Sequence, residues 1–152
     1  MQRIGVFVGS FNPFTIGHDN IVQRALVLFD RLIIGVVGDN VNKPSLSPAE
    51  ERMQAIRSLY ADNPAVEVKP FYGLAMDFAR QEGAQFIIKG VRSAKDFEYE
   101  REQADVNRMV GGIDTLLLYA EPQLSSVSSS MVRELQHFGL DVSRFIPKRS
   151  EA

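Results

Sequence analysis

The chain has 152 residues and a formal net charge of −2, a length that predicts one domain, spanning residues 1–152, with a workable hydrophobic core. This slightly negative charge does not favour binding to nucleic acid or to an anionic membrane, and we expect neither as a partner. No cysteine is present, which excludes disulfides, thiolate metal sites and cysteine nucleophiles and fits a cytoplasmic location. The N-terminus leads directly into a predicted strand and lacks a signal-peptide pattern, and no apolar run approaches membrane-spanning length.

The first elements predicted are a strand over residues 3–9, a loop, and a helix opened by Gly17-His18. Apolar residues recur at helical spacing in this helix, namely Ile21, Val22, Ala25, Leu26, Leu28 and Phe29. A buried strand that leads through a glycine-containing loop into a helix is a phosphate-binding geometry, because free N–H groups and the positive end of the helix dipole face the ligand. His18 adds a hydrogen-bond donor that can be charged or neutral near pH 7.

Strands and helices alternate along the rest of the chain. We predict strands at 32–37, 65–68, 85–89 and 115–119, and helices at 47–60, 73–81, 94–110 and 129–137. The helix at 47–60 begins with Ser47-Pro48-Ala49-Glu50, which has the pattern of a capping box with proline at the first helical position. The helix at 94–110 has only a thin apolar stripe, so we expect it to border a site or another subunit.

This alternation predicts an α/β fold: a Rossmann-like, doubly wound, five-stranded parallel sheet in the order 3-2-1-4-5, with helices on both faces. In that order, strands one and four are neighbours at the topological switch point, and ligands bind there at the carboxyl ends of the strands. Polar segments follow three of the strands, at 9–18, 89–92 and 124–130. We therefore expect these three segments to converge on one ligand.

The residue types in these segments suit a ligand with several phosphates. Ser10 is a candidate phosphate donor, and Lys89 follows a buried strand, where its charge needs a partner such as an anion. Arg92 offers bidentate recognition of phosphate. Ser128 to Ser130 precede a helix and predict a second helix N-terminus for an anion. Lys43 by itself is typical of a solvated surface charge.

Two signatures resemble those of the nucleotidyltransferase superfamily: Thr15-Ile16-Gly17-His18, and Val127-Ser128-Ser129-Ser130-Met131-Val132-Arg133. Further segments narrow the resemblance to the bacterial phosphopantetheine adenylyltransferases. These segments are Gly9-Ser10-Phe11-Asn12-Pro13, Lys43-Pro44, Lys89-Gly90-Val91-Arg92, Asp96-Phe97-Glu98-Tyr99-Glu100 and Asn107-Arg108. The resemblance covers almost the whole chain.

The resemblance implies transfer of the adenylyl group of ATP to 4′-phosphopantetheine, giving dephospho-coenzyme A and pyrophosphate, by direct in-line attack without a covalent enzyme intermediate. It also implies Mg²⁺ carried with ATP, coenzyme A as a feedback ligand in the same site, and a homohexamer. No metal ligand in the protein is expected. The chemistry would consist of positioning and charge stabilisation.

Carried over residue by residue, the resemblance implies that His18, Ser10 and Lys43 are catalytic. It implies a phosphopantetheine site of Ser10, Lys43, Ala75 and Lys89. The implied ATP site comprises Ser10, Phe11, His18, Gly90, Val91, Arg92, Glu100, Leu124, Ser125, Ser126, Val127, Ser128, Ser129 and Ser130.

The chain departs from the family pattern at several of these positions. Ser10 stands where threonine is usual and keeps the hydroxyl, and Asn12 stands where aspartate is usual. Lys89 replaces a common arginine, which removes a bidentate fork. Ala75 stands in place of a larger methionine and Leu124 in place of a frequent aromatic residue. None of these changes removes a central catalytic group.

Two other functions fit part of the pattern. The first signature alone also fits a nucleotidyltransferase that acts on nicotinamide mononucleotide or uses CTP, although the block from Lys89 to Asn107 argues against it. A non-catalytic module that binds a nucleotide or coenzyme A would bind ATP without releasing pyrophosphate. The joint presence of Ser10, His18 and Lys43 argues against this second reading.

Overall fold

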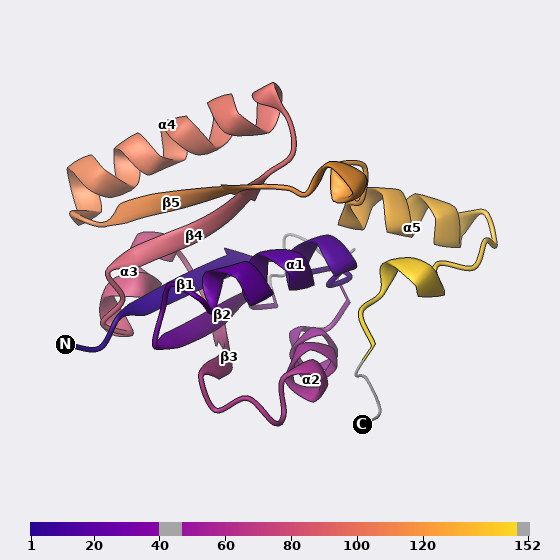
Figure 1. The fold of residues 1–152 in the computed structure, drawn as a ribbon, viewed down its shortest axis with the longest axis horizontal. Helices are drawn as coiled ribbons and strands as arrows, with labels where there is room; N and C mark the ends of the chain where they lie inside the picture. The colour runs from indigo at the N-terminus through magenta and orange to yellow at the C-terminus, as the bar shows by residue number, and fades with distance from the viewer. Residues whose placement is uncertain (40–46, 149–152) are drawn as a thin grey trace.

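The computed structural model describes residues 1–39 and 47–148 and places a five-stranded parallel sheet at the centre of the protein (Figure 1). The strands are β1 (Ile4–Gly9), β2 (Arg31–Val37), β3 (Val66–Phe71), β4 (Phe86–Val91) and β5 (Asp114–Tyr119). Their order is β3-β2-β1-β4-β5, so the predicted topology is confirmed. The central strand β1 pairs with both β2 and β4, and the side chain of its Val6 is fully buried.

Five helices connect or follow these strands within the described residues. They are α1 (Ile16–Ala25), α2 (Ala49–Leu59), α3 (Ala75–Gln81), α4 (Ala94–Gly111) and α5 (Ser129–His137), with short 3₁₀ turns η1 (Pro122–Leu124) and η2 (Ser143–Phe145). No helix among residues 1–39 and 47–148 is long and apolar enough to cross a membrane. The glycine Gly112 ends α4 in the left-handed conformation, with φ of 67°.

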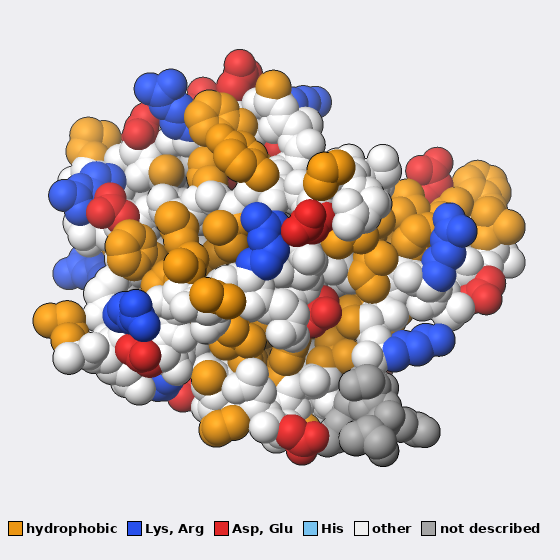
Figure 2. Space-filling view, viewed as in Figure 1, with side chains coloured by type: hydrophobic (Ala, Val, Ile, Leu, Met, Phe, Trp, Pro, Cys, Tyr) orange, Lys and Arg blue, Asp and Glu red, His pale blue; other side chains and the backbone are white. Residues whose placement is uncertain are grey.

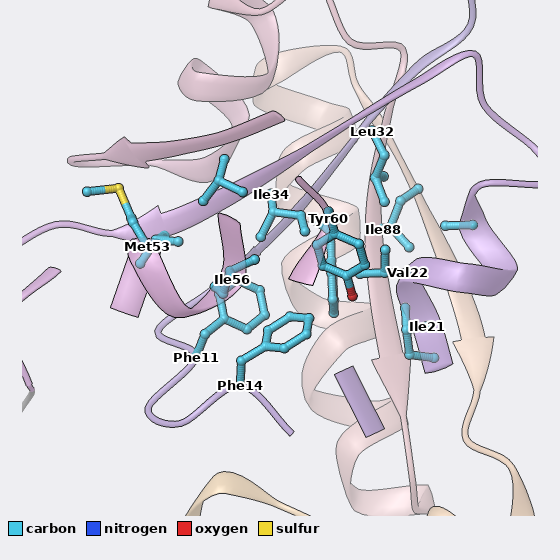
Figure 3. Close-up of a cluster of buried hydrophobic side chains, with 14 of the residues drawn as sticks. Phe11, Phe14, Ile21, Val22, Leu32, Ile34, Met53, Ile56, Tyr60 and Ile88 are labelled. Carbon is cyan, nitrogen blue, oxygen red and sulfur yellow. The ribbon is translucent and has the colours of Figure 1, made fainter. Parts of the chain in front are cut away.

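Helices cover both faces of the sheet. Side chains of α1 and α2 pack with β1 and β2 in one buried cluster, and those of α3 pack with the opposite side of the same strands in a second cluster. Figure 3 shows the first cluster, in which the rings of Phe11 and Phe14 come from the loop after β1 and lie against Ile56 of α2 and Tyr60 just after that helix. The loop that follows β1 is therefore anchored in the core by its aromatic residues.

Helix α4 differs from the other helices because none of its side chains is buried. It lies along β5 at the outer edge of the sheet (Figure 1). Helix α5 lies beyond the carboxyl ends of the strands, away from the faces of the sheet (Figure 1). Its side chains therefore meet the loops at the strand ends rather than the core.

Three boundaries differ from the sequence prediction. Helix α1 ends at Ala25, so Leu28 belongs to the following turn and is 41% exposed. Strand β3 continues to Phe71 and includes Pro70, which is tolerated because β3 is an edge strand. Strand β4 continues to Val91, so Lys89 lies within the strand rather than at its end.

The predicted capping box at the start of α2 is wrong. Pro48 occupies the N-cap position, and no side chain of the box caps the helix. Instead, the Asp39 carboxylate accepts a hydrogen bond from the N–H of Ala49 at 2.8 Å. A carboxylate that follows β2 therefore satisfies the first turn of α2, a long-range contact that local sequence cannot reveal.

Candidate active site

A cavity of about 320 Å³ opens at the carboxyl ends of β1 and β4, between the N-termini of α1 and α5. Most of the predicted site residues line it: Ser10, Phe11, His18, Lys89, Gly90, Val91, Arg92, Glu100, Leu124, Val127, Ser128, Ser129 and Ser130. The three polar segments thus meet at the topological switch point, as the strand order requires. The volume is within the range of small-molecule sites.

Three of the predicted site residues that the structure describes do not line this cavity. Ser125 and Ser126 lie between lining residues of the same loop, but they do not line the cavity themselves. Ala75 begins α3 and packs against the second core cluster. Lys43 lies outside the described residues. The roles of all predicted site residues stay predictions.

The start of α1 fixes the orientation of His18. Thr15 is the N-cap residue, and its side-chain oxygen accepts a hydrogen bond from the N–H of His18. In return, the imidazole Nδ1 of His18 accepts a hydrogen bond from the N–H of Thr15 at 2.9 Å. Because Nδ1 accepts, the proton of the neutral ring is on Nε2. His18 therefore takes the place of the glutamate in an ordinary capping box.

The surroundings of His18 favour its neutral form. Its ring stacks on Phe14 with 5.2 Å between ring centroids, and the edge of Phe11 meets it at 5.0 Å. Burial, and to a smaller extent the positive charge of Arg92, lower the pKa of His18 to about 4. Of the two forms that the sequence left open, these surroundings favour the neutral one at pH 7, with the proton on Nε2.

Two cations reach the cavity from β4 and the turn after it, and α4 supplies an acidic partner to each. Lys89 Nζ lies 3.8 Å from a carboxylate oxygen of Glu100, and Arg92 Nε lies 3.4 Å from one of Asp96. Glu100 is itself a lining residue, with a side chain 15% exposed. Before any ligand binds, Lys89 therefore has a carboxylate partner within the protein, which the sequence did not reveal.

The loop after β1 is bound by the start of α5. Ser128 caps α5 by accepting a hydrogen bond from the N–H of Met131 at 3.1 Å. Arg133, one turn further along, donates to the carbonyl oxygen of Asn12, and Ser129 Oγ donates to the carbonyl oxygen of Pro13 at 2.7 Å. The second signature therefore holds the segment from Gly9 to Pro13, which precedes the first signature in the chain.

Several lining residues were not predicted. Asn20 and Ile21 face the cavity from α1, and Ala120 and Glu121 face it from the segment after β5. Asn20 and Ile21 follow His18 by two and three positions, so their place in the first turns of α1 was a usable signal. No sequence pattern predicts that Ala120 and Glu121 line the cavity, because their position depends on the path of the chain after β5.

The described part of the chain contains no group of three or more His, Asp or Glu side chains that could hold a metal ion. Glu100 and Glu121 are the acidic residues that line the cavity within that part, and Glu100 is paired with Lys89. A divalent ion with few protein ligands is typical of Mg²⁺ bound by nucleotide phosphates.

This fold and cavity define a nucleotidyltransferase of the α/β class, and the family model described as cytidylyltransferase-like matches residues 6–135. The chain belongs to that family and, within it, to the phosphopantetheine adenylyltransferases. It is 50% identical over 150 residues to the phosphopantetheine adenylyltransferase of Bacteroides thetaiotaomicron, an alignment that covers 99% of each chain. It is 43% identical over 148 residues to that of Leuconostoc citreum, which covers 97% of this chain and 93% of the relative.

A solved structure confirms the fold at much lower identity. The crystal structure of a bifunctional NMN adenylyltransferase/ADP ribose pyrophosphatase from Francisella tularensis matches with a TM-score of 0.71 and 19% identity. The match covers 99% of this chain and 46% of that one, so this chain spans about half its length.

Proposed function

We propose that this chain transfers the adenylyl group of ATP to 4′-phosphopantetheine, with dephospho-coenzyme A and pyrophosphate as products. The observation that carries the proposal is the meeting of Ser10, His18, Lys89 and Arg92 with the N-termini of α1 and α5 in one cavity. That cavity belongs to a chain half identical to phosphopantetheine adenylyltransferases. The reaction belongs in the cytoplasm, where ATP is available.

The reaction is an in-line displacement. A phosphate oxygen of phosphopantetheine attacks the α-phosphorus of ATP, and the bond from that phosphorus to the bridging oxygen of the β-phosphate breaks. The electron pair of the broken bond leaves with pyrophosphate, and no bond to the protein forms. Positioning and charge stabilisation therefore supply the rate enhancement.

His18 donates a hydrogen bond from Nε2 to the transferring phosphoryl group. Because Thr15 fixes its ring and its pKa is about 4, it acts as an oriented neutral donor and releases no proton at pH 7. The hydroxyl of Ser10 acts beside it as a second donor. Lys43, assigned through the family resemblance, supplies the third catalytic group.

The two substrates occupy the ends of the same cavity. ATP lies over the N-termini of α1 and α5, against Gly90 to Arg92 and the segment from Leu124 to Ser130, with Glu100 at its edge. Phosphopantetheine binds through its phosphate to Lys89, and its arm extends toward Ala75. Coenzyme A, which carries both halves of the product, binds in the same place as a feedback ligand.

Mg²⁺ enters as part of the substrate, bound to the phosphates of ATP. When bound, the ion neutralises charge on the leaving pyrophosphate. The protein's own contribution is the set of donors and cations described above.

We also propose that the chain assembles as a homohexamer and that α4 forms part of the contact. Several large apolar side chains of α4 are exposed, namely Phe97, Tyr99, Val106, Met109 and Val110. Figure 2 shows hydrophobic side chains at the surface over this helix. Exposed apolar side chains gathered on one element are typical of protein–protein contacts.

The test is pyrophosphate release from ATP and Mg²⁺ with 4′-phosphopantetheine, with nicotinamide mononucleotide, and with no acceptor. We expect release with phosphopantetheine alone. Release with nicotinamide mononucleotide would support adenylyl transfer but would contradict phosphopantetheine as the acceptor. Binding of ATP without release in any mixture would indicate a non-catalytic binding module.

A further inference from the structure

Arg52 of α2 is a buried cation outside the cavity. Its residue is 5% exposed, and charged side chains are rarely buried to this degree without a specific partner. Burial lowers its pKa, which the nearby Asp39 opposes. Taking a guanidinium out of water is costly, and an apolar side chain would fill the space between α2 and the loop more cheaply. The bonds that Arg52 forms therefore need an explanation beyond packing.

The guanidinium of Arg52 joins three segments. Nη1 donates a hydrogen bond to the carbonyl oxygen of Ser10 at 2.7 Å, and Nε donates to the carbonyl oxygen of Ser47 at 2.8 Å. Nη2 lies 3.9 Å from the Asp39 carboxylate and has no hydrogen-bond acceptor among the described residues. The same Asp39 oxygen caps the first turn of α2. Arg52 thus connects the start of α2 to the loop after β1.

The bond to Ser10 fixes one peptide plane at the cavity. The peptide that joins Ser10 to Phe11 is trans and planar, so its C=O and its N–H point in opposite directions. When Arg52 holds the carbonyl oxygen, the N–H of Phe11 is held pointing away from Arg52. Both Ser10 and Phe11 line the cavity, and Phe11 has the uncommon positive φ of 50°.

We propose that Arg52 is a positioning residue for adenylyl transfer, which acts by holding the Ser10–Phe11 peptide so that the Ser10 hydroxyl and the Phe11 N–H face the transferring phosphoryl group. The inference rests on the function proposed above. Arg133 of α5 donates a hydrogen bond to the carbonyl oxygen of Asn12, two residues after Ser10. Two arginines from different helices therefore hold the same loop, and only Arg133 belongs to a recognised signature.

Arg57 provides a matched control on the same helix. Its guanidinium also donates to a main-chain carbonyl oxygen, that of Val68 at 3.1 Å, but Val68 is in β3 and does not line the cavity. Its side chain is 42% exposed. A lysine at either position keeps the charge but cannot donate in two fixed directions as a guanidinium does.

The experiment compares Arg52→Lys with Arg57→Lys, using pyrophosphate release with saturating and varied substrates. We expect Arg52→Lys to lower kcat by about 10²-fold, the size of effect that a misplaced reacting group produces. The KM values for ATP and phosphopantetheine should change by less than about threefold, because the loss occurs in the transition state. Arg57→Lys should keep the kcat of the unmodified chain.

Two further measurements separate positioning from structural support. Thermal unfolding gives the folded fraction of each variant, and the kcat of Arg52→Lys is expressed per folded molecule. Millimolar guanidinium added to Arg52→Ala should restore part of the lost turnover, whereas urea at the same concentration should not.

Unchanged kcat per folded molecule in Arg52→Lys would overturn the role of Arg52, as would an equal loss of kcat in Arg57→Lys. If the unmodified chain itself released no pyrophosphate, the transfer reaction would be wrong and this inference would fail with it. Full activity in the unmodified chain and in both lysine variants would overturn the role of Arg52 but would leave the proposed reaction standing.

Discussion

Ser129 donates a hydrogen bond from its hydroxyl to the carbonyl oxygen of Pro13, 116 positions earlier in the sequence. The acceptor lies in the loop after β1, and the donor is the first residue of α5. This bond and that from Arg133 to Asn12 join α5 to the loop, and Val132 of the same helix is fully buried. The geometry of the cavity thus depends on contacts between the two ends of the chain.

Replacing Ser129 with alanine removes the donor and leaves the Pro13 carbonyl without it. We expect the free energy of unfolding to fall by about 1 kcal/mol, the usual net value of one such bond. Ser125→Ala is the matched control, because the Ser125 hydroxyl donates only within its own exposed turn, to Pro122. Chemical denaturation of both variants measures the difference, and equal losses would contradict the special role of the Ser129 bond.

His18→Ala should greatly reduce turnover while the fold is kept. The variant loses an oriented Nε2 donor, and loss of such a donor costs roughly 10²–10³ in kcat. His137→Ala serves as the control, because His137 ends α5 and does not line the cavity. Steady-state pyrophosphate release measures both, and near-full turnover in His18→Ala would refute the assignment.

The lowered pKa of His18 implies that the free energy of unfolding depends on pH. The pKa is about 4 in the folded protein and 6.5 in the unfolded reference, so between these values only the unfolded state binds the proton. The free energy of unfolding should therefore fall as pH decreases from about 6.5 to about 4, by up to about 3 kcal/mol from this group.

His18→Gln should lack this part of the pH dependence and show a shallower decline than the unmodified chain. Denaturant unfolding at a series of pH values measures the two slopes, and their difference removes the contribution of the carboxylates. An NMR titration of the His18 ring, assigned with His137→Gln, checks the pKa directly. A midpoint near 6.5 would contradict the neutral state.

Lys89→Ala should raise the KM for phosphopantetheine much more than that for ATP. The lysine is paired with Glu100 at 3.8 Å, a distance longer than a hydrogen bond, so its ammonium is available to an incoming phosphate. Lys89→Arg should bind the substrate at least as well, because a guanidinium engages phosphate bidentately. A change confined to the ATP constants would place Lys89 in the other half of the cavity.

Helix α4 allows a test of the proposed assembly. Met109 is 79% exposed, and Met109→Lys should lower the measured molar mass in solution if α4 is buried between copies. Val27 is 80% exposed and lies just after α1, so Val27→Lys is a control of equal exposure on another element. Light scattering after size exclusion measures the mass, and an unchanged mass for Met109→Lys would exclude α4 from the contact.

The strand order and the location of the site could be predicted because they follow from alternating patterns along the chain. Strands such as 32–37 are continuous apolar runs, and parallel strands end at the same edge of a sheet. Ser128 was predictable as a cap because caps obey local rules. The neutral state of His18 was not predictable, since it depends on the packing of Phe11 and Phe14 around the ring.

Contacts between distant segments also could not be predicted from the sequence. The pattern at Ser47 satisfied the local rule for a capping box, yet Asp39 caps α2. The partner of Lys89 was expected to be a ligand, yet Glu100 from the next helix pairs with it. Arg52 gave no signal, because a single arginine in an amphipathic helix is typical of a solvated surface.

The pairing of β1 with β4 links ligand binding to folding. Ile87 of β4 and Val6 of β1 are paired in register, and the cavity wall exists only when these two strands, far apart in sequence, are neighbours. A chain in which these strands are unpaired therefore lacks the cavity, and a nucleotide held there would bind the native state alone. By mass action, a nucleotide concentration 100 times its dissociation constant would add about 2.7 kcal/mol to the unfolding free energy. A bound nucleotide would therefore lower the population of unfolded chain that proteases can cleave.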